Sequence, residues 1–151
     1  MKTTRTLVAF LLATLALPAQ VHADLVVVVN PENKTEQLTK TQIINIFLGN
    51  NREYPGGLPA KPIDLPASST EKALFYRGLV NKDLDQMAAY WSRLVFAGNT
   101  SPPASVASGQ DVLQIVASNR NAIGYLERKS VDTSRVKIVF SLPYCSGPMK
   151  Y

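Results

Sequence analysis

The chain has 151 residues, of which 46% are hydrophobic and 18% are charged, and 16 basic against 11 acidic residues give a net charge of +5. So mild a positive charge does not predict nucleic-acid binding. Cys145 is the only cysteine, which excludes an internal disulfide and any cysteine-ligated zinc or iron–sulfur centre. The only histidine, His22, lies in a segment that we expect to be removed, so histidine-dependent catalysis and histidine metal sites are excluded from the mature protein.

Residues 1–23 have the pattern of a secretory signal peptide. Two basic residues precede an apolar stretch from Leu7 to Leu17, and small residues stand at the expected cleavage site after Ala23. The apolar stretch is too short for a membrane span, and nothing after residue 23 approaches one. We expect a periplasmic protein that keeps 128 of the 151 residues, carries a charge of +3 once the two basic residues are removed, and forms a single domain over residues 24–151.

The first predicted elements of the mature chain are a strand and a helix. Residues 25–29 are a continuous leucine and valine run, which predicts a central strand that is buried on both faces of a sheet. A helix is expected over residues 39–49, opened by a capping box of Thr39 and Gln42. The proline- and glycine-rich residues 50–62 predict a loop.

The middle of the chain predicts a short strand around Ile63, followed by a helix that Ser68–Thr70 open. Asp83 and Gln86 have the spacing of another capping box, ahead of an amphipathic helix that carries Trp91 on its apolar face. For Trp91 we expect core packing rather than a stacking platform for a ligand.

The last predicted elements are one helix and two strands. Ser108 followed by Asp111 opens a helix that ends near Asn119, and strands are expected at residues 122–126 and 136–140. Strands separated by helices need crossover connections. The pattern therefore predicts an α/β fold with a mostly parallel sheet of about four to five strands and helices on both faces.

Several short motifs occur in an order that resembles the periplasmic phosphate-binding proteins of ABC transporters. They are Ile46-Phe47-Leu48-Gly49, Tyr54, Pro62-Ile63-Asp64, Ser68-Ser69-Thr70 with Phe75, and Ala122-Ile123-Gly124-Tyr125. The resemblance covers about residues 25–126 and corresponds mainly to one lobe of these two-lobed proteins. It implies a single-lobe, three-layer sandwich of the periplasmic-binding-protein type, a small oxyanion such as phosphate as ligand, and an ABC permease or another envelope protein as partner.

In the family that the sequence resembles, an oxyanion binds to a Ser-Gly-Thr turn at a helix N-terminus, with an arginine four residues before the serine. The resemblance therefore places an anion on Ser68, Ser69 and Thr70. Here Ser69 replaces the glycine and Asp64 replaces the arginine, so we expect charge repulsion and a phosphate affinity no tighter than about millimolar. The alternative for this segment is structural, with Ser68 as N-cap and Glu71 as its capping-box partner.

Two functions fit these features. One is a solute-binding-like protein that holds phosphate weakly, and the other is a non-catalytic adaptor or sensor component of an envelope complex with a vestigial ligand site. An enzyme is not expected, because Asp83 and Asp85, two residues apart, would point to different sides of a helix. The sequence predicts no cofactor and no metal site.

Overall fold

The computed structural model describes residues 24–142, and both the predicted signal peptide (residues 1–23) and Cys145 lie outside them. The elements in chain order are β1 (Leu25–Val29), α1 (Lys40–Phe47), β2 (Lys61–Asp64), α2 (Thr70–Val80), α3 (Leu84–Phe96), β3 (Ala104–Ser105), α4 (Gly109–Ser118), β4 (Ala122–Glu127), the short 3-10 helix η1 (Arg128–Ser130) and β5 (Lys137–Ser141). Across the described range, no helix combines the length and the apolar character that a membrane span needs.

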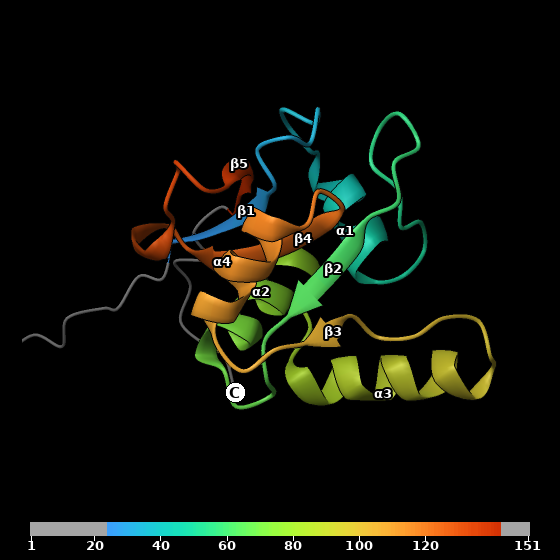
Figure 1. Cartoon of the computed structure of the whole chain (residues 1–151). Coiled ribbons are helices and arrows are strands. Elements are labelled where there is room, and N and C mark those ends of the chain that lie inside the picture. Colours follow the sequence, from blue (N-terminus) through green and yellow to red (C-terminus); the bar gives the residue numbers. More distant parts are fainter. Residues whose placement is uncertain (1–23, 143–151) are drawn as a thin grey trace, which may run out of the picture.

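The strands form one five-stranded sheet with the order β3-β2-β4-β1-β5, which confirms the predicted mostly parallel α/β sheet (Figure 1). β2 pairs in parallel with β3 and β4, whereas β1 lies between β4 and β5 and is antiparallel to both. All five residues of β1 are buried, as expected for a central strand. A strand buried on both faces has no alternating pattern, and its composition does not indicate in which direction it runs.

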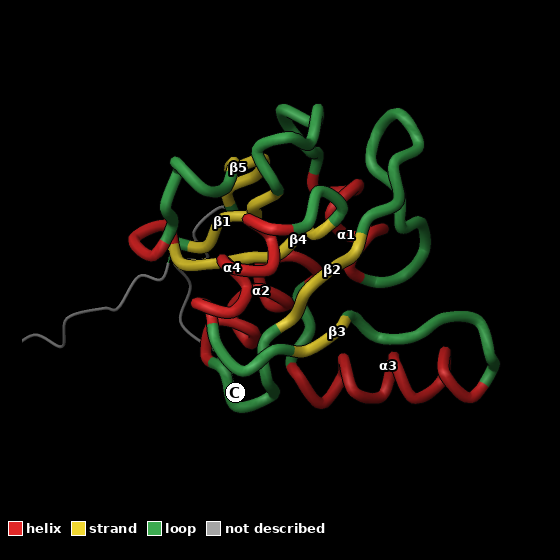
Figure 2. Tube along the Cα trace, viewed as in Figure 1, coloured by secondary structure: helices red, strands yellow, loops and turns green. Residues whose placement is uncertain are grey.

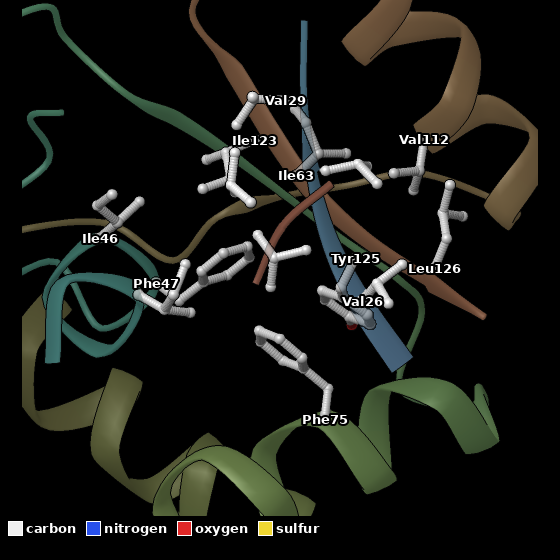
Figure 3. Close-up of a cluster of buried hydrophobic side chains, with 14 of the residues drawn as sticks. Val26, Val29, Ile46, Phe47, Ile63, Phe75, Val112, Ile123, Tyr125 and Leu126 are labelled. Atoms are coloured by element: carbon white, nitrogen blue, oxygen red, sulfur yellow. The ribbon is translucent and has the colours of Figure 1, made fainter. Parts of the chain in front are cut away.

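Helices cover both faces of the sheet, as predicted for a three-layer sandwich (Figure 2). Tyr125 of β4 stacks on Phe75 of α2, while the neighbouring Gly124 faces α4 on the other side. A β-carbon at Gly124 would lie 2.5 Å from Val112 Cγ1, so glycine is what allows α4 to approach the sheet this closely. Phe47 of α1 packs edge-on against Phe75 and extends the apolar layer on the α2 side (Figure 3).

The local signals for helix starts are mostly correct. Both predicted capping boxes form, Thr39 with Gln42 at α1 and Asp83 with Gln86 at α3. Ser108 is the N-cap of α4, as expected. Such caps depend on residues three positions apart, so tertiary packing has little influence on them.

α3 is less deeply buried than its amphipathic sequence predicts. Met87 is its buried residue, whereas Trp91 is only half-buried and packs edge-on against Tyr90. Trp91 therefore contacts the core from its rim instead of lying inside it, which corrects the prediction of a core position. The reason is the place of α3, which packs against α2 beyond the β3 edge of the sheet, so that no further layer covers it (Figure 1).

Candidate functional site

The predicted anion site lies at the N-terminus of α2. Ser69 is the N-cap, and its Oγ accepts a hydrogen bond from the Lys72 amide at 3.2 Å and donates one to Glu71 Oε2 at 2.8 Å. The backbone amide of Glu71 is the main cause that lowers the pKa of this residue, and the Ser69 hydroxyl lowers it further. The Glu71 carboxylate therefore already occupies the amide and the hydroxyl at the first turn of α2 that would otherwise attract an external anion.

The structural alternative for this segment needs one correction. The N-cap is Ser69 and not Ser68, so Glu71 occupies the second helical position and no capping box forms. A hydrogen bond from the Ser69 amide to the Pro66 carbonyl (2.9 Å) closes a turn that starts the helix one residue later than predicted. Of the three predicted site residues, Ser68 and Thr70 are exposed, while the Ser69 hydroxyl caps the helix.

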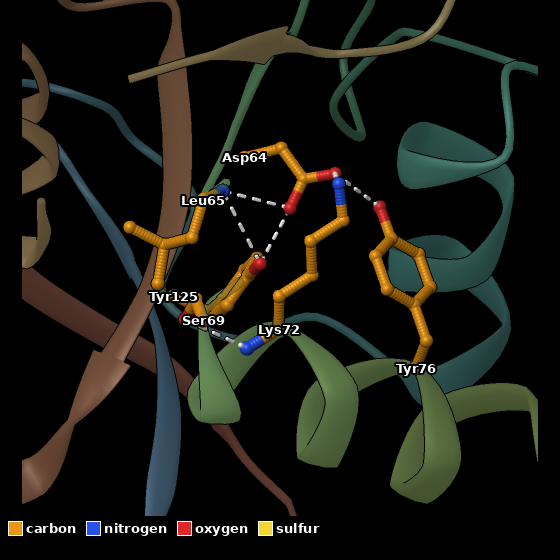
Figure 4. Close-up of polar contacts among 6 residues, drawn as sticks. All are labelled: Asp64, Leu65, Ser69, Lys72, Tyr76 and Tyr125. Carbon is orange, nitrogen blue, oxygen red and sulfur yellow. Dashed lines mark hydrogen bonds and ion pairs between the residues drawn. The ribbon is translucent and has the colours of Figure 1, made fainter. Parts of the chain in front are cut away.

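Beneath the start of α2, Asp64 at the end of β2 is buried, with 3% of its surface exposed. Its Oδ1 accepts hydrogen bonds from the Leu65 amide at 2.8 Å and from the Tyr125 hydroxyl. Its Oδ2 accepts one from the Tyr76 hydroxyl at 2.9 Å and lies 3.2 Å from Lys72 Nζ (Figure 4). Asp64 therefore does not face an open anion site as predicted, since its charge is balanced by Lys72 and its oxygens are satisfied by three further donors.

The two tyrosine hydroxyls at this carboxylate are held protonated. Burial raises the pKa of both Tyr76 and Tyr125, and the neighbouring charge of Asp64 raises it further. Phe75 stacks on Tyr125 at a centroid distance of 3.9 Å and contacts Tyr76 edge-on at 5.2 Å, which fixes the direction of both rings. A protonated hydroxyl beside a carboxylate donates to it, so this cluster is a complete anion-binding arrangement whose occupant is Asp64.

Two cations near the cluster are not among the residues that the sequence singles out. Lys72 and Tyr76 are four residues apart on α2 and therefore share one face. This spacing is the sequence signal from which a common acidic partner could have been predicted. Arg52 lies half-buried in the loop before β2, where burial lowers its pKa, and its charge acts on Tyr76. No periodic pattern marks a loop residue such as Arg52, because its surroundings come from segments far away in the chain.

Two further features bear on the chemistry of the described residues, the grouping of metal-ligating side chains and the pair Asp83 and Asp85. Between residues 24 and 142, no group of three histidine, cysteine, aspartate or glutamate side chains could hold a metal ion. Asp83 accepts a hydrogen bond from the Gln86 amide at 2.8 Å as the cap of α3, and Asp85, two residues later, is exposed, so the two do not form an acid–base pair.

The fold resembles solved structures of phosphate receptors. An ABC-type phosphate transport receptor from Vibrio cholerae matches with a TM-score of 0.61 and 21% identity, over 77% of this chain and 45% of that chain. A phosphate ABC transporter substrate-binding protein with bound phosphate, from Clostridium perfringens, matches with a TM-score of 0.62 and 22% identity, over 77% and 44% of the two chains. PstS from Borrelia burgdorferi matches with a TM-score of 0.57 and 17% identity, over 77% and 46%.

The chain thus spans less than half the length of these receptors, which confirms the resemblance to one lobe of their fold. No family model matches the sequence, and no curated protein matches it either. At these identities the likeness concerns the fold, and the residues around Asp64 must indicate by their own chemistry what this chain can bind.

Proposed function

We propose that this protein is a periplasmic, non-catalytic solute-binding-like module that holds a small oxyanion such as phosphate only weakly, at the N-terminus of α2. Its likeness to one lobe of the phosphate receptors supports this proposal. The hydroxyls of Ser68, Ser69 and Thr70 and the amides of the first turn are the groups that would contact the anion.

The observation that carries the proposal is that the strongest donors near α2 already have an anion. Asp64 forms an ion pair with Lys72 and accepts hydrogen bonds from two tyrosine hydroxyls, and Glu71 accepts one from Ser69 in the first turn of the helix. An exposed helix N-terminus contributes only about 0.3 to 1 kcal/mol to the binding of a negative charge. Millimolar affinity already needs about 4 kcal/mol, so we expect phosphate binding no tighter than about millimolar near neutral pH.

Calorimetric titration with phosphate and with sulfate tests this proposal. Glu71→Gln removes the competing carboxylate while keeping the shape of the side chain, and it should tighten binding several-fold. Asp111→Asn is the matched control, because Asp111 lies in the first turn of α4 and accepts a hydrogen bond from its N-cap Ser108 at 3.0 Å. Micromolar binding by the wild type, or no gain in Glu71→Gln over this control, would contradict the proposal.

The proposed partner is an ABC permease or another envelope protein. The described lobe spans less than half of the receptors that it resembles, so enclosing a solute would require a second protein surface. A second candidate function, a non-catalytic adaptor in an envelope complex, is favoured by the exposed apolar end of α3, where Phe96 is 97% exposed. Under this second function, neither wild type nor Glu71→Gln gives a heat of binding with millimolar phosphate or sulfate.

The proposed location rests on the signal peptide and has its own test. Cleavage after Ala23 predicts that the protein recovered from the periplasm begins at Asp24. N-terminal sequencing of that fraction checks the cleavage site. Recovery of a chain that still begins at Met1, in the cytoplasmic fraction alone, would contradict the proposed location.

A further inference from the structure

The outer face of α3 is a surface that the proposed anion site leaves without a role. Its residues follow helical spacings of three and four and are all exposed: Asp85, Ala88, Ala89, Ser92, Arg93 and Phe96. Phe96 is 97% exposed and its neighbour Val95 is 52% exposed, and these two are the exposed large hydrophobic side chains among residues 24–142. Phenylalanine on the solvent side of an amphipathic helix leaves apolar area in water that a partner could cover.

The fold itself cannot bury Phe96, because the opposite face of α3 is the one that packs. Nine residues, or two and a half turns, separate Phe96 from the buried Met87, so their side chains point in opposite directions. On the inner side, Tyr90 donates a hydrogen bond to the Leu48 carbonyl at 2.7 Å and Trp91 packs against the core. Rotation of α3 to cover Phe96 would expose these contacts. The helix lies at the margin of the molecule (Figure 1).

We infer that the outer face of α3 binds a second copy of this chain, with the two α3 helices packed antiparallel about a two-fold axis. The charges of this face select that arrangement, because Asp85 lies in its first turn and Arg93 in its last turn. Neither side chain forms an ion pair within the described chain. In an antiparallel pair, Arg93 of each copy lies beside Asp85 of the other, whereas a parallel pair would bring like charges together.

The side chains between these charges permit close approach. Ala88, Ala89 and Ser92 occupy the middle of the face, so two helices could pack at the short end of the usual axial separation of about 8 to 10 Å. Phe96 then lies against the first turn of the other helix, which removes part of its ring from water. The two helix dipoles are also antiparallel in this arrangement, which is the favourable orientation.

The size of the face predicts a weak, concentration-dependent dimer. α3 has 13 residues and is therefore about 20 Å long. A pair of such helices buries less than the roughly 1,200 Å² at which stable interfaces begin. We expect half-dimerisation in the range of about 10 to 300 µM, which sedimentation can resolve.

Sedimentation velocity of the purified mature protein across that range tests the inference. Wild type should shift from monomer to dimer, and Phe96→Ser should remain monomeric. Asp85→Arg and Arg93→Asp, each alone, place like charges opposite each other and should also abolish the dimer. The double variant Asp85→Arg/Arg93→Asp exchanges the two charges and should restore it.

Folding and non-specific charge effects are controlled in the same series. Arg120→Asp changes the net charge by the same amount as Arg93→Asp at an exposed position after α4, and it should leave the dimer unchanged. Each charge reversal on α3 places a charge of the unfavourable sign at one end of the helix dipole and so lowers helix stability. The double variant carries both of these losses. Restored dimerisation in the double variant would thus have no explanation in folding, which circular dichroism monitors.

Wild type that remains monomeric throughout the range would overturn the inference, as would a double variant that fails to dimerise while remaining folded. Because the outer face of α3 shares no residue with the start of α2, these outcomes are independent of phosphate titrations.

Discussion

The start of α2 and the outer face of α3 differ in whether their polar, charged and apolar groups already have partners within the described chain. At α2, Ser69 caps the helix and Asp64 receives donors from three parts of the fold. On α3, Phe96 and the charges of Asp85 and Arg93 have no counterpart within residues 24–142. A polar cluster that resembles a binding site can thus be a structural element, while a helix that looks ordinary in sequence can carry an unpaired surface.

The largest expected effect is that of removing the internal carboxylate. Asp64→Ala leaves the half-buried Lys72 without its counter-charge and leaves two buried tyrosine hydroxyls without an acceptor. We therefore expect the free energy of unfolding to fall by about 3 to 5 kcal/mol. Urea denaturation measures it, with Asp85→Ala on the outer face of α3 as the control, for which a loss under about 1 kcal/mol is expected. Equal losses in the two variants would remove the distinction between the two regions.

Alkaline pH should weaken the cluster around Asp64 next. An unfolded tyrosine ionises near pH 10, whereas burial raises the pKa of Tyr76 and Tyr125 in the folded protein. Above pH 10 the unfolded state loses protons that the folded state keeps, so the free energy of unfolding should fall by about 1.4 kcal/mol per pH unit for each of the two residues. This stabilisation is fully present below pH 10, and the outer face of α3 contains no tyrosine.

Denaturation curves between about pH 9 and pH 11 check this slope. Ultraviolet absorbance follows tyrosine ionisation in the same samples. If both tyrosines ionised near pH 10 while the protein stayed folded, the cluster around Asp64 would be open to water. That result would contradict the conclusion that the groups at the start of α2 already bind Asp64.

The two faces of α3 should respond differently to truncation. Trp91→Ala removes a half-buried side chain from the rim of the core, so we expect a loss of about 1 to 3 kcal/mol, below the 3 to 5 kcal/mol that is usual for a deeply buried tryptophan. Phe96→Ala on the outer face should change the stability of the monomer by no more than about 0.5 kcal/mol. Thermal denaturation at low protein concentration compares them, and a larger loss for Phe96→Ala would mean that the chain itself covers this ring.

The smallest expected effect sharpens the assignment of the α2 cap. Ser69→Ala removes the hydroxyl that accepts from the Lys72 amide and should lower stability by about 1 kcal/mol. Ser68→Ala changes an exposed residue outside the helix and should stay within about 0.5 kcal/mol. Chemical denaturation of both variants under identical conditions decides between them, and the reverse order would restore Ser68 as the N-cap.

Features that depend on neighbours within one turn or one strand could be predicted from the sequence alone. The capping boxes of α1 and α3 and the buried run of β1 follow from residues three apart or adjacent, so they appear where the pattern predicts them. The single-lobe α/β architecture could also be predicted, because the order of strands and helices restricts the topologies that remain. The choice between Ser68 and Ser69 as cap could not, since adjacent hydroxyls have equal capping ability and a turn closed by Pro66 decides.

The roles of the polar residues and the exposure of the α3 outer face depend on contacts between segments that are far apart in the chain. Asp64 and Tyr125 are 61 residues apart, and their hydrogen bond exists because β2 and β4 are neighbours in the sheet. The direction of β1 and the marginal position of α3 likewise result from how elements pack, since a hydrophobic pattern states that a face is buried but not what buries it. For the same physical reason, the carboxylate that suggested repulsion of a ligand in the sequence is in the fold the anion that the other groups bind.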